Sequence, residues 1–493
     1  MFEALNLQTT DGEIAVINLE SARRRLWNRF FADPLREGVA ETVVEQEQLT
    51  AEFVGDVQAL DRLEALVGQL VQVEAGSARA ALIQAQVASM AHRFADARHF
   101  LARADIGGAL SADVNRVLLN VDQACGANLG KVLDDRRETA RIFGRTEDLV
   151  ALGALLADLR EFTDADRVYG QALEVYCDVS PFPVAWVCFQ LGMLWGELVP
   201  EPQTARAARW YRTAIDCLPS YTKARVHLAE IYSSSGRASD AEVLLIPAIS
   251  SGDPEVRWRL ADVLTSQKRY AEAEVHMQAA QFGFEALLER HLLAFADHGV
   301  EFYAGSGNSW SRALDLARVN VANRPTLRAF EQAHDVAVNA GDMEAASQIL
   351  AEATMRWGSA TFFGRRVSRS HIRRNGKEQP HDDRSPRFHC QRNLGFRCPG
   401  HSSAAVTTTF LRGKSKPHRF HDVGGAFRMI ARAPTRCGSR SAIHGAPRGD
   451  DQPWSDPPGS AILIILTLYL VLAWLIFANL KIIKLGSRGE GEE

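Results

Sequence analysis

The sequence has few cysteines and no secretory start. Seven cysteines in 493 residues are too few and too scattered for the disulfide framework of a small secreted protein, and they indicate a reducing compartment. The first ten residues contain neither a basic start nor an apolar run, so we expect no signal peptide and no transit peptide. From both absences we expect the folded part of the chain to lie in the cytosol.

Sequence signatures of catalysis are also missing. The run from Arg412 to Ser415 lacks the earlier glycine of a phosphate-binding loop, and there is no GxSxG, HExxH or CxxC motif. Carboxylates are plentiful but scattered along helical faces, where they serve solubility. We therefore predict no catalytic site, no cofactor and no bound metal.

Charge is unevenly distributed along the chain. Residues 1–360 hold 34 Lys and Arg against 50 Asp and Glu, a net charge of −16, whereas residues 361–460 hold 19 against 7, or +12. Half of the 14 His and half of the 18 Pro also fall in that basic hundred. We divide the chain into a helical N-terminal cap (1–77), a solenoid (78–358), a basic low-order segment (359–460), a transmembrane helix (461–483) and a polar tail (484–493).

A repeat occupies residues 78–358. In each copy a small residue is followed four positions later by a large apolar residue and seven positions later by Ala, as in Ala207, Tyr211 and Ala214, which is one face of a helix. Copies recur every 32 to 34 residues. An insertion at 196–203 explains one longer interval, residues 108–145 hold a degenerate copy, and residues 281–325 are the least typical.

These positions resemble the tetratricopeptide repeat (TPR) family, whose pattern runs W-x2-L-G-x2-Y, then A-x3-F, then P. Leu191 and Gly192, and Leu228 with Ala229 and Tyr232, fit its first half. The resemblance covers residues 78–356. It implies an all-α fold, a right-handed superhelical solenoid of antiparallel helix pairs. A small residue at each joint lets the two backbones approach, so Ala241 and Ala273 should be buried.

The resemblance also implies a concave groove for a peptide or partner protein, lined by the first helix of each pair. The candidate groove residues are Trp186, Phe189, Met193, Glu230, Ser233, Trp258 and Asp262. The alternative interpretation for the three aromatic residues is that they only fill the core. The acidic balance argues against a nucleic-acid partner and favours a basic or neutral ligand.

Periodicity stops after Trp357, and residues 359–460 are rich in Arg, Ser, His, Pro and Gly. Such a segment buries too little apolar surface to fold, so we expect disorder. Three interpretations stay open. One is a zinc site, although the spacing fits no common pattern; another is a basic linker that binds RNA or anionic lipid; the third, which we favour, is out-of-frame translation. The candidate zinc ligands are His389, Cys390, Cys398 and His401, or His418, His421 and Cys437.

Residues 461–480 form a run of 20 residues without a charge. As a helix this run is about 30 Å long, enough to cross the hydrocarbon core of a bilayer. The cations Lys481, Lys484 and Arg488 follow it, and counting them alone would put the C-terminus in the cytoplasm and demand export of the solenoid. We favour a single-pass tail anchor that keeps the solenoid in the cytoplasm.

Two functions fit this organisation. The first is a membrane-anchored TPR scaffold for protein–protein interaction, with no catalytic activity. The alternative is the accessory repeat arm of a truncated or frameshifted enzyme, such as a glycosyl- or sulfotransferase. We favour the scaffold, because the sequence contains a docking pattern and no catalytic motif.

Overall fold

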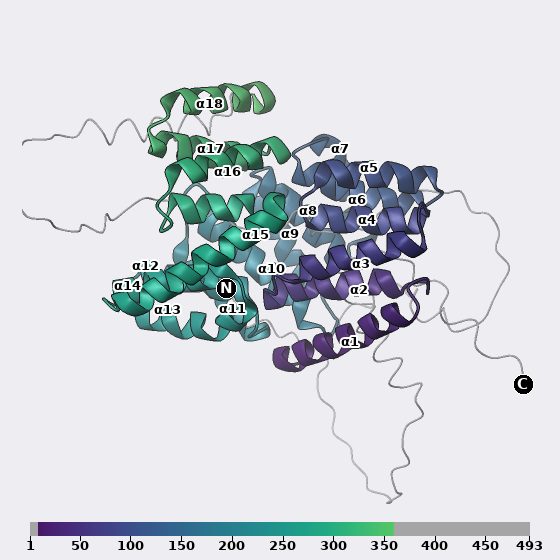
Figure 1. Ribbon diagram of the computed structural model, residues 1–493, viewed down its shortest axis with the longest axis horizontal. Coiled ribbons are helices and arrows are strands. Elements are labelled where there is room, and N and C mark those ends of the chain that lie inside the picture. Colours follow the sequence, from purple (N-terminus) through teal and green to yellow (C-terminus); the bar gives the residue numbers. More distant parts are fainter. Residues whose placement is uncertain (1–7, 359–493) are drawn as a thin grey trace, which may run out of the picture. The chain divides into compact units, whose positions relative to one another are not determined.

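The computed structural model describes residues 8–358, which belong to one structural unit. Every regular element in this range is helical (Figure 1). The expected disordered segment 359–460, the expected transmembrane helix 461–483 and the tail 484–493 lie outside the described residues. Among the helices between residues 8 and 358, none combines the length and the hydropathy needed to cross a bilayer.

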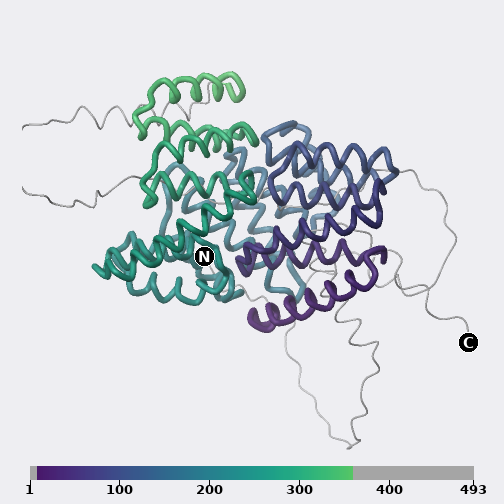
Figure 2. The backbone as a smooth tube through the Cα atoms, in the orientation of Figure 1, coloured from purple at the N-terminus to yellow at the C-terminus, as the bar shows by residue number. Residues whose placement is uncertain are grey.

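Helices α4 to α18 form successive antiparallel pairs (Figure 2). Because α15 contributes to two pairs, these 15 helices make eight pairs. The predicted insertion at 196–203 corresponds to η2 and the loop that follows it. The predicted degenerate copy at 108–145 corresponds to the pair α6–α7. The pairs are α4 (Ala78–Met90) with α5 (Phe94–Ile106), α6 (Ser111–Ala124) with α7 (Leu129–Phe143), α8 (Thr146–Asp158) with α9 (Phe162–Val175), α10 (Pro181–Met193, extended by η2, Leu194–Leu198) with α11 (Thr204–Cys217), α12 (Thr222–Ser234) with α13 (Ala238–Leu245, extended by η3, Ile246–Ser251), α14 (Pro254–Ser266) with the first part of α15 (Tyr270–Ala304), the second part of α15 with α16 (Trp310–Asn323), and α17 (Leu327–Ala340) with α18 (Met343–Trp357).

Helix α15 explains why residues 281–325 are the least typical copy. It is continuous over two pairs and breaks only at His291, whose backbone dihedrals are φ −135° and ψ 50°. The second helix of the sixth pair therefore runs into the first helix of the seventh without the usual turn residues. A pattern search that relies on turns finds no boundary there.

The joints between paired helices have the predicted close packing. A Cβ atom added to Gly153 would lie 2.8 Å from the ring of Tyr169, and one added to Gly192 would lie 2.4 Å from the ring of Tyr211. Both rings are fully buried. Ala241 and Ala273 are buried as well, which confirms that expectation.

Gly192→Ala should destabilise the chain, and Gly170→Ala should stabilise it. In both helices alanine gains roughly 0.8 to 1 kcal/mol of helix propensity over glycine. At Gly192 the added methyl group overpacks the joint with Tyr211, at a cost of about 1 to 3 kcal/mol. At Gly170, on α9, a Cβ would meet nothing within 4 Å. Urea unfolding of the two variants measures the difference, and equal shifts would mean that the joint is not close-packed.

Three helices and a π-helical turn precede the pairs: α1 (Gly12–Ala32), α2 (Val39–Leu49), η1 (Thr50–Val54) and α3 (Ala59–Val73). Helix α3 packs on α4, the position expected of a cap. The N-terminal segment also reaches beyond the first pair, because η1 contacts α12 of the fifth pair. Phe53 accordingly belongs to the same apolar core as the third to sixth pairs.

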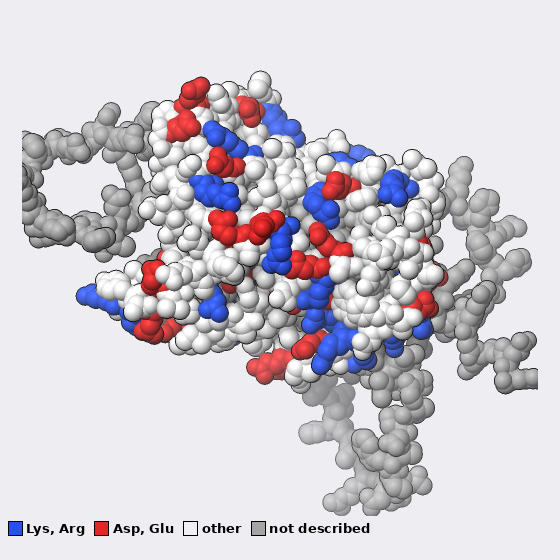
Figure 3. All heavy atoms as spheres, viewed as in Figure 1, with Lys and Arg blue, Asp and Glu red and all other residues white. Residues whose placement is uncertain are grey.

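Pairs at the beginning of the array contact pairs at its end. The Asn323 side chain donates to the His92 carbonyl at 2.9 Å, and Arg160 forms an ion pair with Glu331 at 2.5 Å. A Cβ on Gly126 would lie 2.8 Å from the ring of Trp357. Positive and negative side chains are mixed where α15 lies beside α3 and α4 in this view (Figure 3). These contacts hold together helices that are more than 150 residues apart in sequence.

Candidate functional site

Helix α2 and η1 lie against the first helices of several pairs. We call this first-helix surface the inner face. Ten of the 11 residues of α2 are buried, and five of those ten are polar. A helix that is buried on nearly every side and carries this many polar groups needs partners on the surrounding elements.

Cations and a hydroxyl group on or beside the inner face pair with carboxylates of α2 and η1, whereas Glu47 on α2 pairs with Arg62 on α3. Arg79, on α4, donates to Glu41 at 2.6 Å. Lys223, on α12, lies 2.6 Å from Glu52, whose carboxylate also accepts the Tyr221 hydroxyl at 2.9 Å. Because the side chains of Glu41 and Glu52 are almost completely shielded from solvent, removal of one partner would leave a charge poorly compensated.

An aromatic contact anchors the same segment. The fully buried ring of Phe53 lies 5.0 Å from the ring of Phe182, at the start of α10, and 5.0 Å from that of Tyr221. Just after it, Gly55 has a φ of 74°, and a Cβ there would lie 2.8 Å from the hydroxyl oxygen of Thr222. That hydroxyl donates to the Val54 carbonyl at 2.9 Å. Only glycine satisfies both the conformation and the space at position 55.

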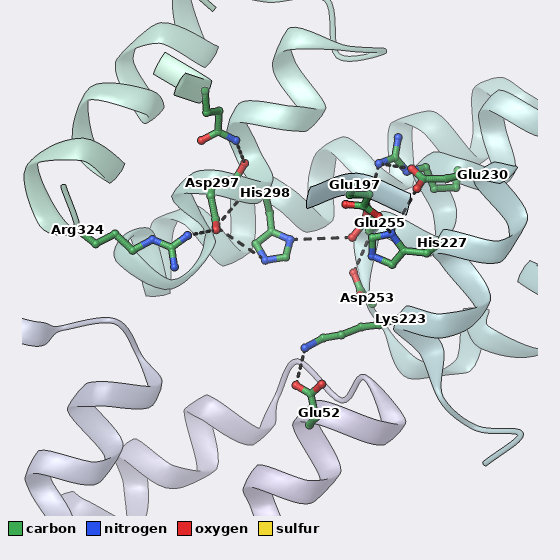
Figure 4. A network of polar contacts seen from close by, with 12 residues as sticks. Glu52, Glu197, Lys223, His227, Glu230, Asp253, Glu255, Asp297, His298 and Arg324 are labelled. Carbon is green, nitrogen blue, oxygen red and sulfur yellow. Dashed lines mark hydrogen bonds and ion pairs between the residues drawn. The ribbon is translucent and has the colours of Figure 1, made fainter. Parts of the chain in front are cut away.

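A buried polar network continues along the inner face from α10 to α14 (Figure 4). The Nδ1 atom of His227 lies 2.8 Å from Glu197, and the Arg259 guanidinium lies 2.5 Å from Glu230 and 3.1 Å from Glu255. Burial alone would lower the pKa of His227. The charge of Glu197 and its hydrogen bond, together with the charges of Glu230 and Glu255, outweigh that effect and raise the pKa to about 9.

The network then reaches the second part of α15. His298 lies between Glu255, at 4.0 Å, and Asp297, at 3.8 Å, and Arg324 pairs with Asp297. Four successive pairs are thereby connected through charged groups instead of apolar side chains alone. Within residues 8–358, no group of three or more His, Cys, Asp or Glu side chains is arranged to hold a metal ion.

The structure places the candidate groove residues in two environments. Trp186, Phe189 and Trp258 are 3%, 0% and 3% exposed, and Met193 is also buried. Their side chains lie in the core, where Phe189 packs against His227 with the ring centroids 5.4 Å apart. A partner-binding role for these four residues stays a prediction.

Glu230, Ser233 and Asp262 are only partly buried. Glu230 belongs to the polar network through Arg259. Asp262 accepts a hydrogen bond from the Ser306 hydroxyl at 2.7 Å, and burial raises its pKa. These residues, on α12 and α14, are the part of the predicted groove that solvent reaches.

Of the residues that form the network, sequence reasoning identified only Glu230. Glu52, Lys223, His227 and Glu197 belong to no motif, and the first two are 171 residues apart. One signal was available. Gln190, His227 and Arg259 each precede a Leu followed by Gly or Ala, so a polar residue recurs at one position of the repeat.

No family model matches the sequence, and no curated protein matches it. Solved structures do match it. The chain is similar to one in the Cut9–Hcn1 hetero-tetramer of the APC/C, with 14% identity over 65% of this chain and 60% of that one and a TM-score of 0.35. It thus spans less than two thirds of that chain. Yeast Tom70 matches with 13% identity over 73% and 96% of the two chains and a TM-score of 0.29. The TPR domain of P58(IPK) matches with 11% identity over 74% and 96% and a TM-score of 0.23.

The chain is TPR-like. Its paired helices recur at the TPR interval, and a small residue on one helix faces an aromatic ring on its partner in the joints of α8–α9 and α10–α11. The described residues form an all-helical solenoid of such pairs.

Proposed function

We propose that this chain is a scaffold for protein–protein interaction without catalytic activity, held at a membrane by residues 461–483 with its helix pairs in the cytoplasm. The partner, a protein or peptide, binds the solvent-accessible part of the inner face, around Ser233 and Asp262. The membrane anchor rests on the uncharged run at 461–480.

The observation that supports this proposal is the way in which the inner face holds α2 and η1. One stretch of helical chain is bound there by carboxylate–cation pairs and by an aromatic anchor. The same kinds of contact fix helical segments in the grooves of other proteins. An inner face that holds one helical segment in this way has the chemistry to hold a second where it is open.

In-cell photocrosslinking on the full chain tests the proposal. A photoreactive amino acid replaces Ser233, on α12, and membranes are washed with alkaline carbonate before the adducts are identified. We expect the chain to stay with the washed membranes and Ser233 to give one discrete protein adduct.

The matched control is Val243, on α13, the second helix of the same pair, whose side chain is 70% exposed. It should give no such adduct, because second helices do not form the inner face. The scaffold proposal fails if both positions label the same proteins, and the anchor fails if carbonate extracts the chain.

A further inference from the structure

A cavity of about 160 Å³ lies where the N-terminal helices meet the first, fifth, sixth and seventh pairs. It is close in size to an engineered cavity of about 150 Å³ in another protein, which holds benzene. There is therefore room for one ring or for a short hydrocarbon chain. The groove residues predicted from the sequence do not line it.

One part of the cavity wall is apolar. Leu60 from α3, Met90 from α4, and Phe284 and Phe295 from α15 line it. Such a surface favours a hydrocarbon body, because that body leaves water when it binds. The two phenyl rings can also face a cation.

The polar part of the wall carries more carboxylates than cations. Four carboxylates are accompanied by one ammonium group and two imidazoles, from Glu52, Asp56, Asp253, Asp297, Lys223, His92 and His298. The His92 imidazole carries no charge at neutral pH, because burial and then the charge of Arg324 lower its pKa to about 3. The wall is therefore acidic.

Three of these carboxylates have cationic partners in the fold. Glu52 lies 2.6 Å from Lys223, Asp56 lies 2.8 Å from Arg62, and Asp297 pairs with Arg324. Asp253 differs. Its carboxylate accepts the Glu255 backbone N–H at 2.9 Å, and among residues 8–358 it has no ion-pair partner. Burial and then the charge of Glu255 raise its pKa to about 6, although the more distant charges of His298 and Lys223 act in the opposite direction.

Three segments with irregular backbone geometry line or adjoin this cavity. The π-helical turn η1 carries Glu52, His92 has a φ of 55°, and α15 breaks at His291, three residues before the lining residue Ala294. Such local departures from regular geometry cost free energy and concentrate at binding sites.

We propose that this cavity binds a small primary amine with an apolar body, its ammonium group at Asp253 and its hydrocarbon against Phe284 and Phe295. The ligand supplies the direct ion-pair partner that Asp253 lacks among residues 8–358 and fills the apolar space beside it. Because the wall comes from four pairs and the N-terminal helices, binding also tightens the contact between them. An anionic ligand is disfavoured, since Lys223 is already engaged by Glu52.

Calorimetry on the full chain in detergent micelles tests this site with three probes of equal size, benzylamine, benzyl alcohol and benzoate. We expect benzylamine to bind about tenfold tighter than benzyl alcohol, as one buried charge contact would give, and benzoate to bind weakest. Asp253→Asn should weaken benzylamine about tenfold and leave benzyl alcohol unchanged. Asp253 is the N-cap of α14, and asparagine caps a helix equally well, so the unfolding midpoint of the variant should stay close to that of the wild type.

The matched control is Asp240→Asn, which removes an exposed carboxylate on α13 and should leave all three affinities unchanged. Equal affinities for benzylamine and benzyl alcohol, tightest binding by benzoate, no binding of any probe, or an Asp253→Asn variant that keeps the wild-type affinity would each overturn the proposal. None of these outcomes bears on the protein partner at Ser233.

Discussion

Replacing Phe53 by alanine is expected to lower the free energy of unfolding by roughly 3 to 5 kcal/mol. The ring is fully buried, and it lies between Phe182 and Tyr221, on elements about 130 and 170 residues further along the chain. Truncation removes the buried apolar surface and leaves a cavity that three packed elements cannot fill by collapse. Urea unfolding of the full chain measures the loss.

The region that Phe53→Ala destabilises is as informative as the total loss of unfolding free energy. Phe53 is the only aromatic residue that η1 contributes. Its removal should therefore loosen α2 and η1 more than the pairs themselves, and hydrogen exchange should show the greatest loss of protection at residues 39–54. Phe53→Leu, which keeps most of the apolar volume, should lose less and provides a variant that still folds.

Phe282→Ala is the matched control, because that ring lies on α15 and is 79% exposed. We expect it to change the free energy of unfolding by less than about 0.5 kcal/mol. If Phe53→Ala costs no more than the control, or if protection at 39–54 is unchanged, then the N-terminal segment is not anchored to the inner face at this point.

The sequence predicted the helix pairs because their signal is local. A small residue, a large apolar one and Ala at positions i, i+4 and i+7 lie on one helical face, and in the folded chain that face forms one side of the joint, as Tyr211 on α11 does against Gly192 on α10. The weak repeat pattern at residues 281–325 has a local reason too. The chain continues through His291 as helix, and no turn residue marks the boundary.

The polar network could not be predicted in the same way. Glu52 meets Lys223, and Asp297 meets Arg324, only because separate helices pack together, and no periodicity within one helix records such a contact. For Trp186 and Trp258 the repeat pattern identified the helix but not the direction of the side chain. Both rings point into the core, the environment that large aromatic side chains favour.

The second large effect is a loss of stability between about pH 6.5 and 9 that belongs to His227. An unfolded histidine has a pKa of about 6.5, whereas the contact with Glu197 raises the pKa of the folded group to about 9. Between these values the folded chain binds more protons than the unfolded chain. The stabilising contribution is therefore complete below pH 6.5 and is lost as the pH rises through 9, a change of roughly 3 kcal/mol.

The measurement is the difference in unfolding free energy between the wild type and His227→Gln, followed from pH 6 to 9.5. Subtraction is needed because Glu147, whose pKa burial raises to about 7, also titrates in this range. The difference should shrink with rising pH, and His99→Gln, at an exposed position on α5, should show no such trend. A flat difference would mean that the pKa of His227 is the same in the folded and the unfolded chain, and a growing one would mean that burial outweighs Glu197 and keeps His227 neutral in the folded chain. Because the pair joins η2 to α12, deprotonation also removes this charged contact between the fourth and fifth pairs, beside the proposed partner surface at Ser233.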